Sequence, residues 1–110
     1  MKPFVAQGPT VLITAAVSAP TGSLVAGAGT TRCQQYKLEN AGLTTLYAAT
    51  GQTAAAAQTN AVIPTAGTNQ NVYPVNSGEP VYVTDMVDCF WSAACASGTN
   101  ALYVTPGYMG

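Results

Sequence analysis

The stretch that decides the fold is residues 31–51, which read TRCQQYKLENAGLTTLYAATG. Its first part alternates, so Tyr36 and Leu38 point to one side of an extended chain while their charged neighbours point to the other. The sequence Asn-Ala-Gly at 40–42 predicts a turn, because Asn and Gly tolerate the positive φ of tight hairpin turns. The stretch therefore predicts two β-strands joined as a hairpin.

The rest of the chain also favours short strands. Thr, Val, Ala and Tyr are common, Glu and Lys are rare, and Gly and Pro recur at short intervals. Turn sequences come about every 8 to 12 residues, which is the spacing of an antiparallel sandwich. The Ala-rich segment inside 50–60 lies between polar residues, so a loop is predicted there. The predicted strands are 10–18, 22–26, 31–39, 44–49, 61–63, 70–75, 80–84, 88–96 and 101–105.

These patterns together predict an all-β fold. We expect an antiparallel β-sandwich or jelly roll with about 8 short strands. Pro64, Pro74 and Pro80 lie in or beside predicted strands and belong at edges or bends, because proline cannot donate to a β-ladder. Residues 1–9 are expected to form an extended arm, and residues 10–110 a single domain.

Charge is scarce in this chain. Only 6% of its 110 residues are charged, against roughly 25% in a typical soluble domain, and the net charge is -1. Few charges leave a free monomer poorly protected against association. The composition therefore favours a subunit of a larger assembly, with a secreted, neutral β domain as the alternative.

The same composition argues against several other classes. The 3 cationic residues can neutralise only a few phosphates, which disfavours nucleic acid as a partner. Prolines and glycines limit the apolar run to 11–17, well short of the roughly 20 residues of a membrane span. Gly8 and Pro9 interrupt the N-terminal segment where a signal peptide would need its apolar region. We therefore expect synthesis in the cytoplasm, with use there or release by lysis.

The 3 cysteines cannot all pair within one chain. They are expected to be small buried residues of strands, although a disulfide that involves Cys89 or Cys95 stays open. A zinc site would need a fourth ligand from a carboxylate or another chain, since the sequence contains no His. The cysteines are Cys33, Cys89 and Cys95.

No catalytic set can be assembled from the sequence, so we expect neither an enzyme nor a cofactor. His, the commonest general base, is absent. Asp85 and Asp88 point to opposite faces of an extended segment and are more simply solvated charges than a Ca²⁺ site. The glycines at 22–29 lack the lysine and the helix of a phosphate-binding loop.

The aromatic residues allow two interpretations. Most of the 6 Tyr, 2 Phe and 1 Trp should lie in the core or at subunit interfaces, but some could form a flat platform for a sugar. Both ends of the chain are expected to pack on a neighbouring subunit. The candidate subunit contacts are Phe4, Arg32, Lys37, Glu39 and Tyr108.

Two segments carry a resemblance to a known family. QYKLENAGLTTLYAATG at 35–51 and ALYVTPG at 101–107 resemble the Asn-Ala/Ser-Gly turn and the LeuTyrValThrProGly ending of small β-sandwich capsid decoration (cement) proteins of tailed bacteriophages. Residues 85–95 have no counterpart in that group. The resemblance implies a jelly-roll or Ig-like sandwich on the outside of the capsid.

It further implies a structural virion protein that bridges adjacent major capsid protein subunits, itself a dimer or trimer, made in the host cytoplasm. Such bridging would stabilise the assembled shell by mass action, multiplied over many copies. The alternatives are another virion component (tail, collar or spike), a carbohydrate-binding host-attachment module, and a pilus-type surface subunit with oxidised cysteines.

Overall fold

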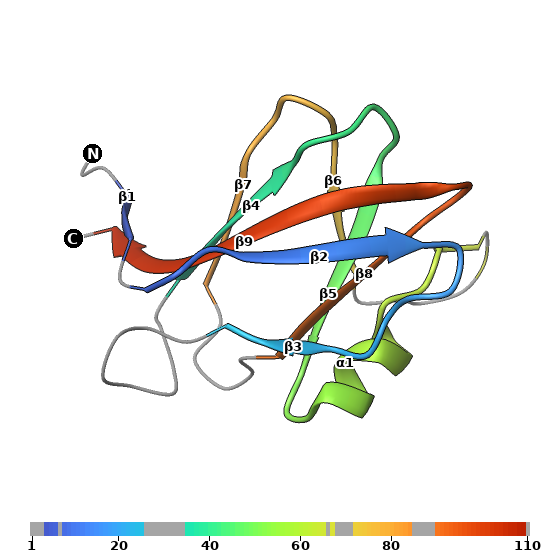
Figure 1. Cartoon of the computed structure of the whole chain (residues 1–110), viewed down its shortest axis with the longest axis horizontal. Helices are drawn as coiled ribbons and strands as arrows, with labels where there is room; N and C mark the ends of the chain where they lie inside the picture. Colours follow the sequence, from blue (N-terminus) through green and yellow to red (C-terminus); the bar gives the residue numbers. More distant parts are fainter. Residues whose placement is uncertain are drawn as a thin grey trace.

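The computed structural model of the chain describes residues 4–6, 8–25, 35–65, 67, 72–84 and 90–109 (Figure 1). The described part consists mainly of β-strands, as predicted, and also contains one short helix that was not predicted. The elements are β1 Phe4–Ala6, β2 Val11–Ala16, β3 Ser23–Leu24, β4 Gln35–Asn40, β5 Leu46–Gly51, α1 Ala54–Asn60, β6 Tyr73–Val75, β7 Val81–Thr84, β8 Phe90–Cys95 and β9 Thr99–Met109.

The strands form one sheet in the order β6-β5-β8-β2-β9-β4-β7, with β1 beside β9 and β3 beside β8. Most neighbours are antiparallel, but β2 and β8 pair in parallel at Ala16 and Ala94. The sheet is therefore mixed, and the prediction of a purely antiparallel arrangement is wrong at this junction.

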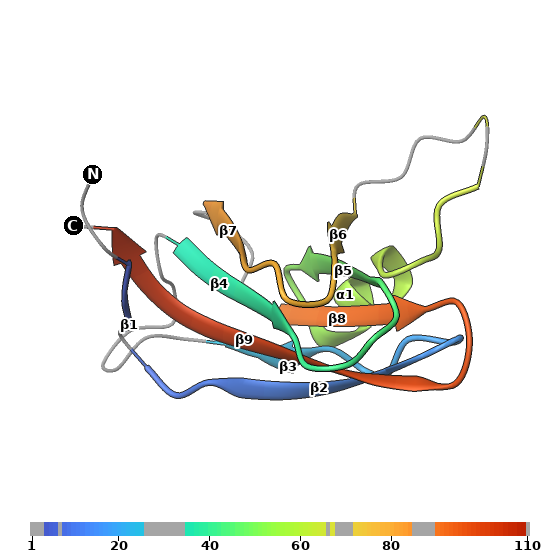
Figure 2. The same ribbon diagram turned by 90° about the horizontal axis from the view of Figure 1, so that it is seen from above.

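That junction divides the sheet into two halves. Strands β6, β5, β8 and β3 form one half, and β2, β9, β4, β7 and β1 form the other. The sheet curls so that both halves surround a common core, giving a nearly closed, barrel-like shape (Figure 2). Its ends are the short strands β6 and β7.

The core takes side chains from both halves. The Tyr36 and Trp91 rings meet edge-to-face, with centroids 5.2 Å apart and an interplanar angle of 63°. Around them pack aliphatic side chains from the inward positions of each strand, as the period-2 alternation requires. The fully or almost fully buried cluster is Ile13, Ala15, Val25, Tyr36, Leu38, Leu46, Ala48, Val75, Val83, Trp91, Ala93, Cys95, Leu102 and Val104.

The predicted hairpin does not form. Strand β4 pairs with β7 and β9, whereas β5 pairs with β6 and β8, so residues 41–45 connect the two halves of the sheet. Neither Asn40 nor Gly42 has positive φ. Instead, the Gly42 N–H donates to the Asn40 side-chain oxygen at 2.9 Å, an Asx-type turn that redirects the chain.

A helix replaces the loop predicted over 50–60. Thr53 caps α1, its hydroxyl accepting from the Ala56 N–H at 3.1 Å. The buried Ala57 packs where Gly22 and Gly51 leave room: a Cβ at Gly51 would lie 2.4 Å from the Ala57 nitrogen. A chain of small residues thus packs closely against β5 and β8, which explains why a segment without large apolar residues is ordered.

The predicted edge positions of two prolines are confirmed, but the predicted strand at 61–63 is wrong. Strand β6 contains Pro74 at the end of the sheet, and Pro80 directly precedes β7 at the other end, so both lie at edges as predicted. Residues 61–63 are not a strand, because the Ala61 N–H donates to Ala57 as the cap of α1 and Pro64 follows. The predicted N-terminal arm contains β1, which pairs with the end of β9.

Candidate functional site

The outward side of the half formed by β2, β9, β4 and β7 is the candidate site. In β4, Tyr36 and Leu38 point into the core, so Lys37 and Glu39 point outward. The same alternation in β7 places Val83 inside and Tyr82 outside. We name this surface the outer face and define it by Phe4, Leu12, Lys37, Glu39, Tyr82 and Tyr103.

Strand register brings these side chains together. Tyr103 of β9 lies between Leu12 of β2 and Glu39 of β4, and Lys37 pairs with Tyr82 of β7. Such cross-strand neighbours have Cβ atoms about 5 Å apart. Leu12, Tyr82 and Tyr103 remain 53%, 45% and 38% exposed, so apolar and aromatic surface adjoins the two charges.

Lys37 and Glu39, the two charged residues of the outer face, form an ion pair. The Lys37 Nζ lies 3.6 Å from Glu39 Oε1, and the two side chains are 30% and 49% exposed. A solvent-exposed pair of this length contributes little to stability. Both groups therefore remain able to interact with a partner.

The structure brings together three of the five predicted contact residues. Besides Lys37 and Glu39, the half-buried Phe4 lies on the outer face, with its ring centroid 5.6 Å from that of Tyr82. Tyr108 lies in β9, where it pairs with Val5 of β1, and Arg32 is outside the described residues.

Further polar side chains lie among and beside the residues of the outer face. Thr105 is the neighbour of Lys37 across β9 and β4, and its hydroxyl oxygen lies 2.8 Å from that of Thr10. The Gln35 side-chain amide donates to the Thr84 hydroxyl at 3.3 Å. Protein interfaces commonly mix apolar and aromatic side chains with polar ones.

A second feature lies where the chain passes from β4 to β5. The Asn40 side-chain amide donates to the Thr44 carbonyl at 2.7 Å and to the Val75 carbonyl at 2.8 Å. The Asn100 amide nitrogen lies 2.6 Å from the Thr44 carbonyl oxygen and 3.1 Å from the Asn40 side-chain oxygen. Both asparagines are buried, so this amide network fixes the connection between the two halves.

Sequence reasoning missed parts of both features. The alternation of Val81, Tyr82 and Val83 in the sequence predicts that Tyr82 lies on the opposite side of the strand from the two valines. No local pattern predicts that Tyr82 pairs with Lys37. The contact between the side chains of Asn100 and Asn40 spans 60 positions of the sequence. Strand pairing, which local patterns do not encode, creates both arrangements.

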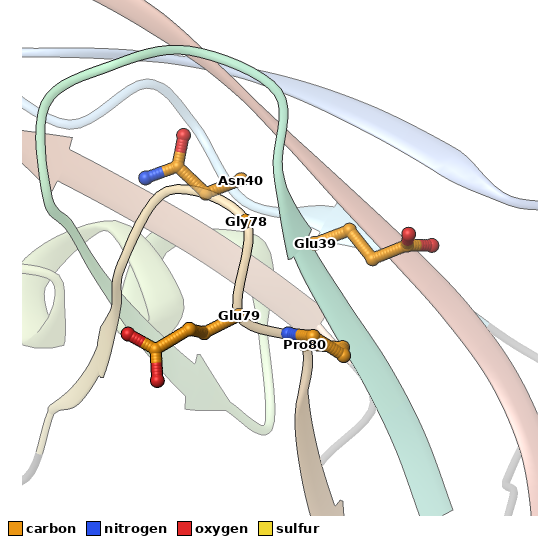
Figure 3. A pocket seen from close by; sticks show the side chains of 5 residues that line it. All are labelled: Glu39, Asn40, Gly78, Glu79 and Pro80. Carbon is orange, nitrogen blue, oxygen red and sulfur yellow. The ribbon is translucent and has the colours of Figure 1, made fainter.

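A small pocket lies beside the outer face, lined by Glu39, Asn40, Gly78, Glu79 and Pro80 (Figure 3). Its volume is about 90 Å³, whereas small-molecule sites are usually about 300 Å³ or larger. The two carboxylates point away from each other (Figure 3). They therefore do not form a pair for acid–base chemistry or for binding one cation.

The structure describes only some of the other candidate residues. Cys95 carries a free, fully buried thiol in β8, which confirms the expectation of a buried strand residue. Its sulfur lies 3.5 Å from the Ser97 carbonyl oxygen. Cys33, Cys89, Asp85 and Asp88 are outside the described residues. Within the described ranges, no three His, Cys, Asp or Glu residues gather as a metal site.

In the part of the chain that the structure describes, the helix is too short and too polar to cross a membrane. Comparison with known proteins adds no name to this geometry: no family model matches the chain, and no curated protein or solved structure matches it at a significant level.

Proposed function

We propose that the protein is a structural subunit of a bacteriophage virion, and that it decorates and stabilises the capsid by bridging adjacent major capsid protein subunits. The outer face carries this proposal. It exposes Leu12, Tyr82 and Tyr103 around one pair of charges, in a chain with very little charge elsewhere. Such a surface gains free energy when a protein covers it.

The proposal includes the finer architecture. The two halves of the sheet would act as the two layers of a β-sandwich, jelly-roll or Ig-like, because β2 and β8 are joined by a single pairing in the described residues. One layer then holds the outer face, while the other carries α1. An experimental structure of the particle-bound chain would test this division.

Bridging would stabilise the shell through mass action. A protein that binds two neighbouring subunits of the assembled shell, and not the separated subunits, shifts the equilibrium toward assembly. Many weak, repeated contacts suffice for a large total effect. The chain would act on the exterior of the head, itself as a dimer or trimer, without a cofactor or a chemical step.

The test is binding to empty capsid shells that lack this chain, prepared from the bacteriophage that encodes it. We expect saturable binding, a higher melting temperature of the shell, and density on the head exterior by electron microscopy. Tyr103→Ser should weaken binding roughly 10-fold or more, because it removes about one buried side chain from the contact.

Tyr47→Ser is the matched control. Tyr47 is a partly buried residue of β5, in the half of the sheet that does not contribute to the outer face. It should leave binding unchanged once both variants are shown to be folded. Density on the tail or collar, or no binding to shells, would contradict capsid decoration.

A carbohydrate-binding host-attachment module is the second candidate. Tyr82 and Tyr103 are both partly exposed on the outer face, on the two sides of β4, and aromatic faces can stack on sugars. A glycan array followed by titration of the best ligand would test this function. Binding lost in Tyr82→Ala and Tyr103→Ala, without binding to shells, would replace the first proposal with the second.

A further inference from the structure

Strand β2 has an open backbone edge over most of its length. One edge pairs with β9 at every residue from Val11 to Ala16. On the other edge, Ala16 pairs with Ala94 of β8, and the two strands diverge from that point, so the described residues show no further pairing there (Figure 1). Alternate residues of 11–15 therefore direct their N–H and C=O groups away from the sheet.

The other edges of the described sheet carry protection that β2 lacks. Proteins limit pairing with foreign strands by proline, by charged residues and by short edge strands. Strand β6 contains Pro74, and β3 has only two residues. Pro80 directly precedes β7, and Glu79 and Asp85 flank that strand in the sequence. Residues 10–17, Thr-Val-Leu-Ile-Thr-Ala-Ala-Val, contain neither proline nor charge.

Apolar surface accompanies the open edge. Leu12 points outward from the open part of β2 and is 53% exposed. Its neighbours Val11 and Ile13 point toward the core, where Val11 is only partly buried. Another β-strand with apolar side chains satisfies both features, because an extended backbone presents N–H and C=O groups at the matching spacing.

We propose that two copies of the chain pair through β2, in antiparallel orientation, around a two-fold axis at Leu12. Strand β2 is complementary to itself in this arrangement. Leu12 lies opposite Leu12 of the second copy, and Val11 lies opposite Ile13. Opposite residues of antiparallel strands share a face, so the two outward leucines bury each other. Residues 10–14 carry no charge, so the symmetric contact brings no like charges together.

Two features set the position of the axis. Toward the end of β2, Ala94 already occupies the edge at Ala16, so a second copy cannot pair there. Before β2, Pro9 has no N–H to donate. The pairing is therefore centred in the first half of the strand. It makes one sheet of two, in the order β4-β9-β2 followed by β2-β9-β4 of the second copy.

The pairing supplies the second binding surface that bridging requires, and in this role it rests on the proposed function. One chain carries one outer face, whereas a bridge contacts two neighbouring shell subunits. In the paired sheet both outer faces lie on the same side, because outward residues of antiparallel strands share a face. Leu12 is then covered by the second copy, while Tyr82 and Tyr103 of each copy face the shell.

Sedimentation velocity of the purified chain, from micromolar to millimolar concentration, tests the pairing without shells. The unmodified chain should form dimers. Leu12→Lys and Leu12→Glu should each weaken the dimer roughly 10-fold or more, because they remove the apolar contact and place like charges opposite each other. Leu43→Lys is the matched control: Leu43 is 94% exposed but lies between β4 and β5, away from β2. It should dimerise as the unmodified chain does.

A mixture of the two charged variants tests the position of the axis. Lys and Glu lie opposite each other only if residue 12 is at the two-fold axis, so the mixture should form dimers although neither variant does alone. Circular dichroism should show that both variants fold, since the Leu12 side chain is half exposed. If one does not fold, Thr14→Lys takes its place, because Thr14 is an exposed residue of the same strand.

The remaining outcomes overturn the pairing. They are a chain that stays monomeric at every concentration, a dimer that persists in Leu12→Lys, and a trimer. Dissociation by Tyr103→Lys but not by Leu12→Lys would place the contact on the outer face instead. Shell binding is measured separately. A dimer that does not bind shells contradicts the proposed function and leaves the pairing intact, whereas a monomer that binds shells does the reverse.

Discussion

At the scale of single residues, Gly42 should be required for its small size. A Cβ at this position would lie 1.8 Å from the Asn100 side-chain oxygen. Gly42→Ala must therefore displace Asn100, leaving buried amide and carbonyl groups with fewer partners. We expect a loss of about 2 kcal/mol in the free energy of unfolding, measured by urea denaturation.

A double-mutant cycle would identify the cause. In an Asn100→Ala background the conflicting oxygen is gone, so adding Gly42→Ala should cost much less than it does in the unmodified chain. Equal costs in both backgrounds would mean that the backbone conformation at residue 42, and not the amide network, accounts for the glycine.

The same residues show how far sequence reasoning reaches. Asn and Gly at 40–42 correctly predicted a change of direction, since both suit turns. The type of connection was wrong, because a hairpin and a connection between two halves use similar residues. The difference lies in Asn100, because the pairing of β9 with β4 brings its amide into contact with Asn40 and Thr44.

At the scale of elements, α1 should depend on its N-terminal cap. Seven residues are too few for a stable isolated helix, so its ends and its packing decide whether it forms. Thr53→Ala removes the acceptor for the Ala56 N–H and should lower stability by about 1 kcal/mol. Thermal denaturation followed by circular dichroism would measure the change.

Thr59→Ala is the matched control within the same helix. The Thr59 hydroxyl donates to the Ala55 carbonyl, which α1 does not require, and Ala is the better helix former. Its effect should be about 0.5 kcal/mol or less. A larger loss from Thr59→Ala than from Thr53→Ala would show that the cap is not the deciding interaction.

Most strands could be predicted and the helix could not, for one physical reason. Strands such as β4 and β8 carry large apolar residues in a regular pattern, and that pattern is visible locally. Helix α1 buries little except Ala57, and its room comes from Gly22 and Gly51 on other elements. For the outer face, outward positions such as Lys37 and Glu39 were predictable. Their grouping with Leu12 and Tyr103 needed the strand order.

At the scale of the whole molecule, the two halves should unfold together. They share one core, in which Tyr36 of β4 packs against Trp91 of β8. Trp91 is the one tryptophan of the chain and is fully buried, so its fluorescence reports this contact. We expect its urea transition to coincide with that of far-ultraviolet circular dichroism, as in a two-state domain. Separated transitions would mean that each half is stable alone.

The scarcity of charge makes a prediction about the assembled state. Contacts dominated by charge weaken strongly as salt screens them, whereas burial of apolar surface does not. The outer face offers Lys37 and Glu39 as one exposed pair, among Leu12, Tyr82 and Tyr103. Affinity for shells should therefore change less than about threefold between about 0.05 M and about 0.5 M NaCl.

Sulfate is the informative comparison, because it strengthens apolar burial while it also screens charge. At matched ionic strength, sodium sulfate should increase binding relative to sodium chloride. The double variant Lys37→Glu and Glu39→Lys exchanges the two charges without changing the net charge. A change in its affinity at a fixed salt concentration therefore reports the arrangement of the charges and not their screening. If binding falls more than about tenfold with NaCl, charge pairing and not apolar burial holds the chain on its partner.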